Sequence, residues 1–113
     1  MEIAISSLGD HLVRIALQGR LDTQGVDRVE TRFVAAIVPG GHNAIVDMSQ
    51  VEFVSSMGIR MFVATARTLK ARQLKLVLYG VSPQVGQVFE AVALQKIIPI
   101  CKTEEDAAST IAA

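Results

Sequence analysis

The order of strand-like and helix-like segments is the feature that most constrains the fold of this chain. After two short strand-like segments, apolar residues recur alternately at helical and at strand spacing to the end of the sequence. Parallel strands are joined through helices, so this alternation predicts an α/β fold with a mixed, mostly parallel sheet of about four to five strands and about four helices. The predicted order is β-β-α-β-α-β-α-β-α.

The N-terminal part is predicted to form a hairpin followed by a helix. Glu2–Ser6 and His11–Gln18 are the expected strands, because they flank the turn signal Gly9-Asp10 and the second alternates apolar and polar residues. Thr23 is the expected cap of a helix that ends before Pro39-Gly40-Gly41. The apolar positions of this helix recur at helical spacing: Val26, Val29, Phe33 and Ile37.

The central part is predicted to hold a buried strand, a loop and a second helix. Ala44–Val46 is a short apolar run typical of a strand covered on both faces. A polar loop is expected from Asp47 to Ser55, followed by a helix from about Ser56 to Ala71. The buried stripe of that helix is predicted to consist of Ile59, Phe62, Val63, Ala66 and Leu69.

The C-terminal part is predicted to add two strands and two helices. Leu74–Tyr79 is an expected strand, and Ser82-Pro83 is a strong helix start because serine caps and proline suits the first turn. Ile97-Ile98 is the expected last strand. Thr103–Asp106 then opens a terminal helix with acidic residues at its positive end.

Length, charge and cysteine content exclude several classes of protein. A chain of 113 residues is expected to form a single domain over residues 1–113. Eleven basic and eleven acidic residues give a net charge of zero, which disfavours nucleic-acid binding. Only Cys101, His11 and His42 could supply soft metal ligands, so we expect no metal site and no cofactor. The single cysteine and the short apolar runs indicate a cytoplasmic protein without a membrane span.

The start of the second helix carries the strongest functional signal. A serine there has an ordinary explanation, because its hydroxyl caps free backbone N–H groups. The functional alternative is that Ser56 accepts a phosphoryl group, which the positive helix end would stabilise. Arg60 lies four residues on and could reach the phosphate, and Asp22 and Asp47 are expected at strand ends beside it.

The same helix offers a candidate interaction surface. Met57, Met61 and Ala64 are spaced so that they lie beside one another and off the predicted buried stripe. If exposed, they form an adaptable apolar patch beside Ser56 for a partner protein. The alternative is that they pack against a neighbouring helix or loop.

The chain resembles the STAS domain family, which is found in anti-sigma factor antagonists and sulfate transporters. Gly19–Asp22 is similar to the family's Gly-Glu-Leu-Asp, and Ile45–Phe53 is similar to its aliphatic-Asp-Leu-Ser-x-Val-x-Phe run. Val54–Ile59 falls on the family's x-Asp-Ser-Ser/Thr-Gly-Leu, with Gly58 on the motif glycine. Leu76–Phe89 and Leu94–Ile100 extend the resemblance over nearly the whole chain.

The resemblance implies a bacterial partner-switching protein of signal transduction and transcription regulation. The family's phosphoacceptor falls on Ser56, and Asp22 matches an aspartate beside that site. The unmodified protein is expected to bind an anti-sigma factor with a histidine-kinase-like ATPase fold, which phosphorylates the serine and so releases the antagonist. A metal-dependent phosphatase of the PP2C type is expected to reset it.

Departures from the family motif leave alternatives open, and one of them is Arg60, which stands where the family has a small residue. Ser55 replaces the aspartate before the acceptor and is itself a second possible acceptor, and Met57 replaces the second Ser/Thr. A non-switching STAS docking or scaffold subunit, in a lipid-transport ABC complex or a stress-signalling assembly, is therefore the alternative function. An enzyme is not expected, because no acid, base and nucleophile occur in a recognisable arrangement.

Overall fold

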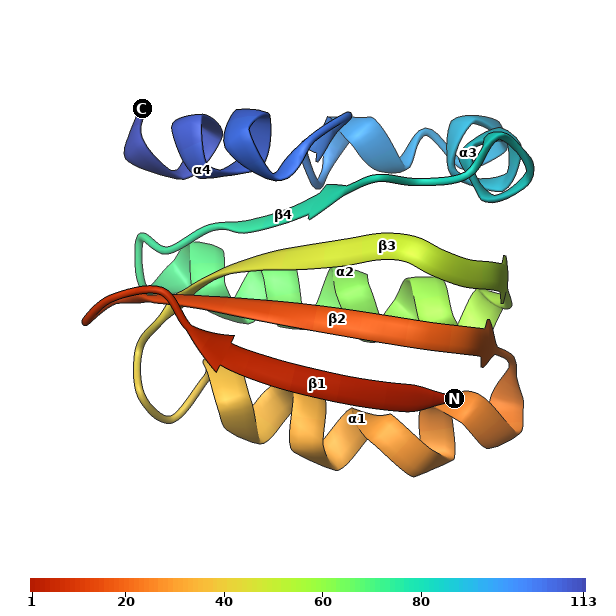
Figure 1. Ribbon diagram of the computed structural model, residues 1–113, viewed down its shortest axis with the longest axis horizontal. Coiled ribbons are helices and arrows are strands. Elements are labelled where there is room, and N and C mark those ends of the chain that lie inside the picture. The colour runs from red at the N-terminus through yellow and green to blue at the C-terminus, as the bar shows by residue number, and fades with distance from the viewer.

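The computed structural model describes residues 1–113 and contains one five-stranded sheet in the order β1-β2-β3-β4-β5 (Figure 1). β1 pairs antiparallel with β2, and all other neighbours are parallel. The strands are β1 (Glu2–Ser7), β2 (Leu12–Leu21), β3 (Asn43–Val54), β4 (Leu76–Tyr79) and β5 (Ile100–Cys101). The hairpin and the mixed, mostly parallel sheet are as the sequence predicts.

Four α-helices and one 3-10 helix connect and cover the strands. They are α1 (Thr23–Ile37), α2 (Ser56–Ala71), α3 (Pro83–Ala91), η1 (Leu94–Lys96) and α4 (Glu104–Ala112). In Figure 1, α1 and α2 run behind β1, β2 and β3, and no helix lies over the near face of these strands. The element order confirms the predicted β-β-α-β-α-β-α-β-α fold. None of the helices has the length and apolarity that a membrane crossing requires.

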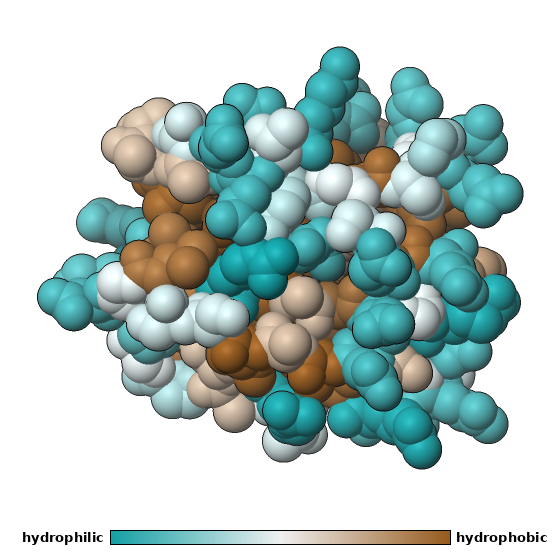
Figure 2. Space-filling model, viewed as in Figure 1, coloured by the Kyte–Doolittle hydropathy of each residue, from teal (hydrophilic) through white to brown (hydrophobic).

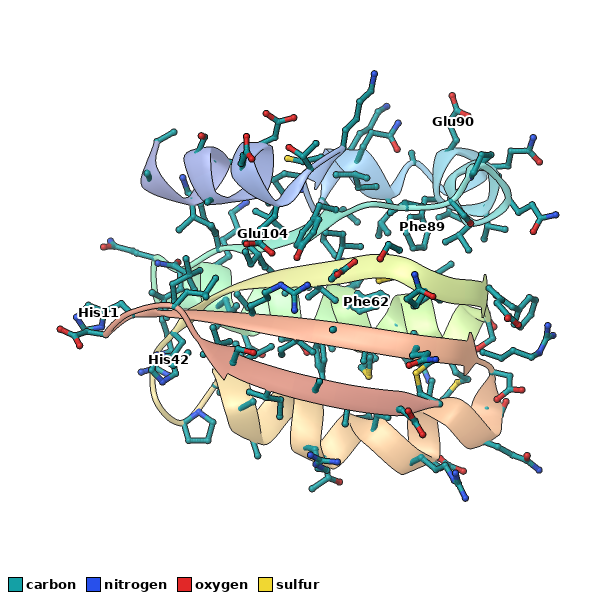
Figure 3. The ribbon with its side chains drawn as sticks, viewed as in Figure 1. His11, His42, Phe62, Phe89, Glu90 and Glu104 are labelled. Carbon is teal, nitrogen blue, oxygen red and sulfur yellow. The ribbon has the colours of Figure 1, made fainter.

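The core lies on the face of the sheet that α1, α2 and α3 cover. It is a cluster of 23 buried residues, in which the rings of Phe33 on α1 and Phe62 on α2 meet edge to face with centroids 5.7 Å apart. Phe89 brings α3 into the same cluster (Figure 3). A smaller cluster on the opposite face places Ala107 of α4 against the sheet. α4 packs mainly on β3, β4 and β5 and meets β2 at Arg14, so most of the face of β1 and β2 on that side stays open.

The predicted loop from Asp47 to Ser55 is wrong, because β3 continues to Val54. The register between β2 and β3 shifts twice in this stretch, so β3 carries extra residues relative to β2. As a result, the buried side chains of the distal half, Met48, Val51 and Val54, recur at every third position. The alternation that identifies a strand from sequence is therefore lost there.

Several further boundaries differ from the prediction. β2 runs on to Leu21 rather than ending at Gln18, and β4 begins at Leu76 rather than Leu74. Asp22, rather than Thr23, caps α1, because the aspartate accepts a hydrogen bond from Gly25 N. The last strand is Ile100–Cys101 rather than Ile97-Ile98, since Ile98 is buried in the core and Ile97 is exposed. The predicted Ser82 cap of α3 and the predicted acidic first turn of α4 are confirmed.

Candidate functional site

The candidate site lies where β2 and β3 end side by side. Leu21 pairs with Val54, and Ser55 N donates to Leu21 O at 2.9 Å. The turns into α1 and α2 therefore begin next to each other, at the carboxyl ends of parallel strands. This edge is where open α/β sheets bind their ligands.

Each of the two helices is capped by the residue that follows its strand. Asp22 Oδ1 accepts from Gly25 N at 2.8 Å, and Ser55 Oγ accepts from Gly58 N at 3.3 Å. Ser55 Oγ also donates to Leu21 O at 2.9 Å. The hydroxyl of Ser55 is thus engaged both as a donor and as an acceptor.

Two glycines allow these helix starts to approach the strand ends closely. A Cβ on Gly25 would lie 2.2 Å from Arg20 O, which is a backbone atom. A Cβ on Gly58 would lie 2.8 Å from Leu21 Cδ2 and 3.0 Å from Val54 Cγ1. Both positions thus require a residue without a side chain.

Ser56 is the first residue of α2 and is exposed to solvent. No hydrogen bond within the chain holds its hydroxyl, in contrast to that of Ser55. Arg60, one turn further on, is also exposed and takes part in neither of the ion pairs of the protein. The arrangement offers an accessible hydroxyl, the N–H groups of a helix start and an exposed cation without an ion pair.

Asp47 does not lie at this site. It is in the middle of β3, opposite Ala16, and its Oδ2 accepts from Arg14 Nη2 at 2.7 Å. Its Oδ1 accepts from Ser49 N at 2.9 Å. The prediction that Asp47 neighbours the acceptor serine is wrong, because the strand that carries it runs on to Val54.

Arg14 and Asp47 belong to a polar cluster on the open face of the sheet. Arg14 Nε donates to Tyr79 Oη at 2.9 Å and to Glu104 Oε1 at 2.7 Å, and Tyr79 Oη donates to Glu104 Oε1 at 2.8 Å. Glu104 reaches the cluster from the start of α4 (Figure 3). The hydrogen bond from Arg14 lowers the pKa of Glu104 and raises that of Arg14 itself. Burial, followed by the contact with Glu104, raises the pKa of Tyr79 from 10.0 to about 12.

The predicted apolar patch on α2 is only partly present. Met57 is 40% exposed and Ala64 is exposed, but Met61 is 1% exposed and belongs to the core. Met61 adjoins Phe62 and faces the sheet with it, whereas Ile59 and Val63 of the predicted stripe are only partly buried. The prediction of Met61 as a partner contact is wrong.

The sequence reasoning missed Arg20, Phe53 and Val88. Phe53 and Val88 are each 38% exposed and line one groove with Arg20, whose guanidinium carbon lies 4.5 Å from the centroid of the Phe53 ring. Signals in the sequence could have identified Arg20 and Phe53, though none marks Val88. Arg20 stands where the family motif has a glutamate, and Phe53 directly precedes the Val-Ser-Ser turn.

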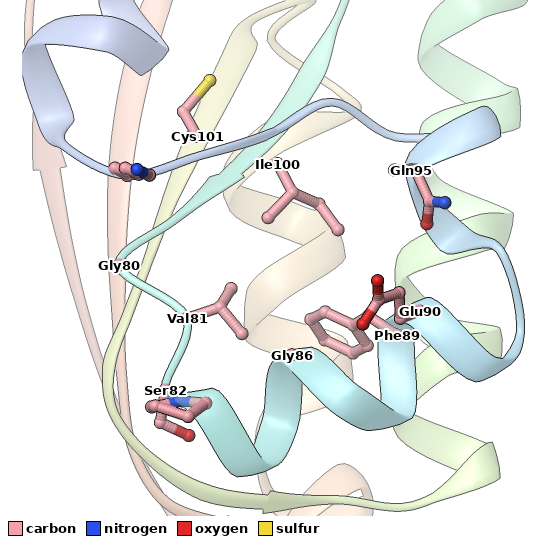
Figure 4. Close-up of a pocket in the computed structure, with 11 residues that line it drawn as sticks. Gly80, Val81, Ser82, Gly86, Phe89, Glu90, Gln95, Ile100 and Cys101 are labelled. Atoms are coloured by element: carbon pink, nitrogen blue, oxygen red, sulfur yellow. The ribbon is translucent and has the colours of Figure 1, made fainter.

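The largest cavity, about 660 Å³, lies apart from Ser56 between α3, η1 and the end of β5 (Figure 4). Apolar side chains from Val81, Phe89 and Ile100 line it, and Glu90 and Lys102 are at its walls. Nowhere in the chain do three or more His, Cys, Asp or Glu side chains come together as a group that could hold a metal ion.

The model of the STAS domain family matches residues 4–107 of this chain. An anti-sigma-B factor antagonist of Listeria monocytogenes serovar 1/2a is 30% identical over 95 residues, which are 84% of this chain and 82% of that relative. The unphosphorylated anti-sigma factor antagonist SpoIIAA superimposes with a TM-score of 0.79 at 22% identity, over 98% of this chain and 96% of that one. SpoIIAA of Bacillus in its phosphorylated form superimposes with a TM-score of 0.69 at 23% identity, over 97% and 99% of the two chains.

Proposed function

The chain belongs to the STAS domain family, and on this premise we propose that it is an anti-sigma factor antagonist whose docking is controlled by phosphorylation of Ser56. The unmodified chain binds an anti-sigma factor with a histidine-kinase-like ATPase fold, in the bacterial cytoplasm. That partner transfers the γ-phosphoryl group of ATP to Ser56, and a phosphatase of the PP2C type removes it. The role of the relatives named as antagonists supports this proposal. As a STAS regulatory domain, the chain is not an enzyme.

The observation that carries the proposal is that the hydroxyls of two adjacent serines differ in their hydrogen bonding. Ser55 holds the helix cap and the contact with Leu21 O, so modifying its hydroxyl would break both hydrogen bonds. Ser56 is exposed and its hydroxyl is not used by the fold. Phosphorylation of Ser56 therefore changes charge without requiring the fold to change.

The surroundings of Ser56 favour a phosphate electrostatically. A phosphoserine carries about −1.5 to −2 charges, and the start of a helix stabilises an anion. Arg60 is close enough along α2 to pair with it. The carboxylate of Asp22 is the nearest acid in the turn beside it, but it is engaged as a cap with Gly25 N.

Phosphorylation beside a docking surface explains release of the partner. Met57 is exposed directly after Ser56, so a partner that contacts Met57 would also face the phosphate. Burying an uncompensated dianion against an apolar or acidic surface opposes binding by desolvation and repulsion.

The proposal is tested by intact-mass measurement after incubation with ATP, Mg²⁺ and the purified kinase-like anti-sigma factor of the same genome. The wild-type chain and the Ser55→Ala variant are expected to gain the mass of one phosphate, and the Ser56→Ala variant is expected to gain none. The added mass should disappear on treatment with a PP2C-type phosphatase. A gain that persists in Ser56→Ala but is lost in Ser55→Ala would move the acceptor to Ser55.

One feature of the chain favours the second candidate, a non-switching docking subunit. Ser55 replaces the family's acidic residue before the acceptor, so the acceptor turn has lost one carboxylate. If the chain binds its partner tightly but gains no phosphate under any of these conditions, the docking subunit is the better description.

A further inference from the structure

Next to the candidate site, an arginine lies on an exposed aromatic ring at the end of the sheet. Arg20 of β2 and Phe53 of β3 are cross-strand neighbours, and the guanidinium carbon is 4.5 Å from the ring centroid. Both side chains are exposed. Phe53 is three residues before Ser56 in the sequence, and Leu21 and Val54, the next pair, hold the turn that leads to it.

The ring forms part of a groove rather than an isolated exposed residue. Arg20, Phe53 and Val88 line a hollow of about 320 Å³ between the end of β3 and α3. Its other lining residues are Glu52, Val54, Gln84 and Val85. Phe53 and Val88 are two of the few large apolar side chains left exposed by the fold. Figure 2 shows that polar side chains otherwise dominate the face of the molecule on which β1, β2 and β3 lie, with apolar atoms only in patches between them.

The charges around this groove are not neutralised within the chain. Both ion pairs of the protein use Arg14, so Arg20 and Arg60 have no carboxylate partner. Glu52 also lines the groove but forms no ion pair with either arginine. A guanidinium that stacks on a ring keeps its N–H groups at its edges, where they can bind a carboxylate in two-pronged fashion. The groove thus presents an apolar centre beside the unpaired guanidinium of Arg20, with the unpaired carboxylate of Glu52 also in its lining.

We infer that Arg20, Phe53 and Val88 form a docking surface for a partner segment that carries carboxylates beside an apolar side chain. The inference rests on the proposed function, since the partner is the anti-sigma factor that Ser56 controls. The apolar side chain packs on Phe53 and Val88, and a carboxylate pairs with Arg20. A phosphate on Ser56 would then repel an acidic partner segment, which weakens docking.

The inference is tested by measuring affinity for the purified anti-sigma factor in a Ser56→Ala background, where phosphorylation cannot interfere. Arg20→Glu is expected to weaken binding at least about tenfold, and Phe53→Ala is expected to weaken it by a similar factor. Arg20→Lys keeps the charge but loses the planar fork, so we expect an intermediate loss. Raising the salt concentration from about 50 to about 500 mM should weaken the parent more than Arg20→Glu.

Arg67→Glu is the matched control, because Arg67 is an exposed arginine on α2 about two turns beyond Arg60. It makes the same change in net charge and should bind within about twofold of the parent, as expected when screening limits distant surface charges. Thermal unfolding of each variant verifies that the fold is retained. One outcome would overturn the docking surface alone. In it, Arg20→Glu and Phe53→Ala leave binding unchanged, whereas Ser56→Asp still weakens it. No binding by the parent would overturn the proposed function and this inference together.

Discussion

At the residue scale, the central feature is that two neighbouring serines have different hydrogen-bonding roles. The hydroxyl of Ser55 links the start of α2 to the end of β2, through Gly58 N and Leu21 O. The hydroxyl of Ser56 faces solvent and links nothing. The cap and the proposed phosphorylation therefore use different hydroxyl groups, and single substitutions should separate their effects.

Ser55→Ala is expected to lower stability, whereas Ser56→Ala is expected to leave it unchanged. Losing a helix cap costs about 1 kcal/mol, which corresponds to a fall in Tm of about 4 °C for a domain of this size. Leu21 O keeps its hydrogen bond from Ser55 N, so no buried acceptor is left unpaired. Calorimetry of the two variants checks this expectation, and equal melting temperatures would contradict the assignment of the cap.

The cluster around Tyr79 makes a second prediction at the residue scale. Its pKa is raised from 10.0 to about 12, so the folded chain holds the phenolic proton more tightly than the unfolded chain does. This contribution to stability is complete below pH 10 and is lost as the pH rises from 10 to about 12. Tyr79→Phe should therefore lose less stability than the wild type over that interval.

Tyr79 is the only tyrosine, so the ultraviolet absorbance of tyrosinate follows this one group. Removal of Glu104 as a partner by Glu104→Gln should bring the titration midpoint closer to the ordinary value, because the contact with that carboxylate helps to raise the pKa. A midpoint near 10.0 in the folded wild-type chain would contradict the cluster.

At the element scale, the starts of α1 and α2 are pressed against the ends of β2 and β3. Gly25 and Gly58 permit that approach, because a side chain at either position would meet Arg20 O or Leu21 and Val54. Gly86 in α3 is a contrasting case, since a Cβ there would have its nearest neighbour, Val81 Cγ1, at 3.8 Å. The packing thus requires glycine at positions 25 and 58, whereas position 86 has room for a side-chain methyl group.

Alanine substitutions at these glycines should have opposite effects. Gly58→Ala is expected to destabilise the protein by about 1–3 kcal/mol through overpacking against Leu21. Gly25→Ala should be worse, because the atom it meets belongs to the backbone and cannot rotate away. Gly86→Ala should stabilise by up to about 1 kcal/mol, since alanine is the better helix former. Urea unfolding of the three variants measures the signs, and a destabilised Gly86→Ala or a neutral Gly25→Ala would contradict the packing.

The sequence is sufficient to predict most of the elements but not the end of β3. Helices with regular apolar spacing and standard caps, such as the one that Ser82-Pro83 opens, are recognisable because each local signal agrees with the next. The distal half of β3 is not, since its two register shifts replace alternation with a three-residue spacing. With this half of β3 predicted as a loop, Asp47 is expected at a strand end. That expectation places it wrongly beside the candidate acceptor serine.

At the scale of the whole molecule, the fold gathers the residues of the proposed site at one end of the sheet. The carboxyl ends of β2 and β3 carry Arg20, the ring of Phe53 and the turn with Ser55 and Ser56. The motif predicts the acceptor serine, since it is a linear pattern in the sequence. The docking residues on β2, β3 and α3 are not predictable in this way, because only the sheet register and the placement of α3 bring them together. Met61 is expected on the surface but is buried. The sequence does not predict this, because the burial of its side chain depends on how α2 is rotated against the sheet.

The most direct test of the account is the affinity of the anti-sigma factor for the chain before and after phosphorylation of Ser56, measured by titration calorimetry. The phosphorylated chain and the Ser56→Asp variant are expected to bind at least about tenfold more weakly, whereas Ser56→Ala should bind as the unmodified chain does. Equal affinities of the phosphorylated and unmodified chains would contradict control of docking by the charge on Ser56.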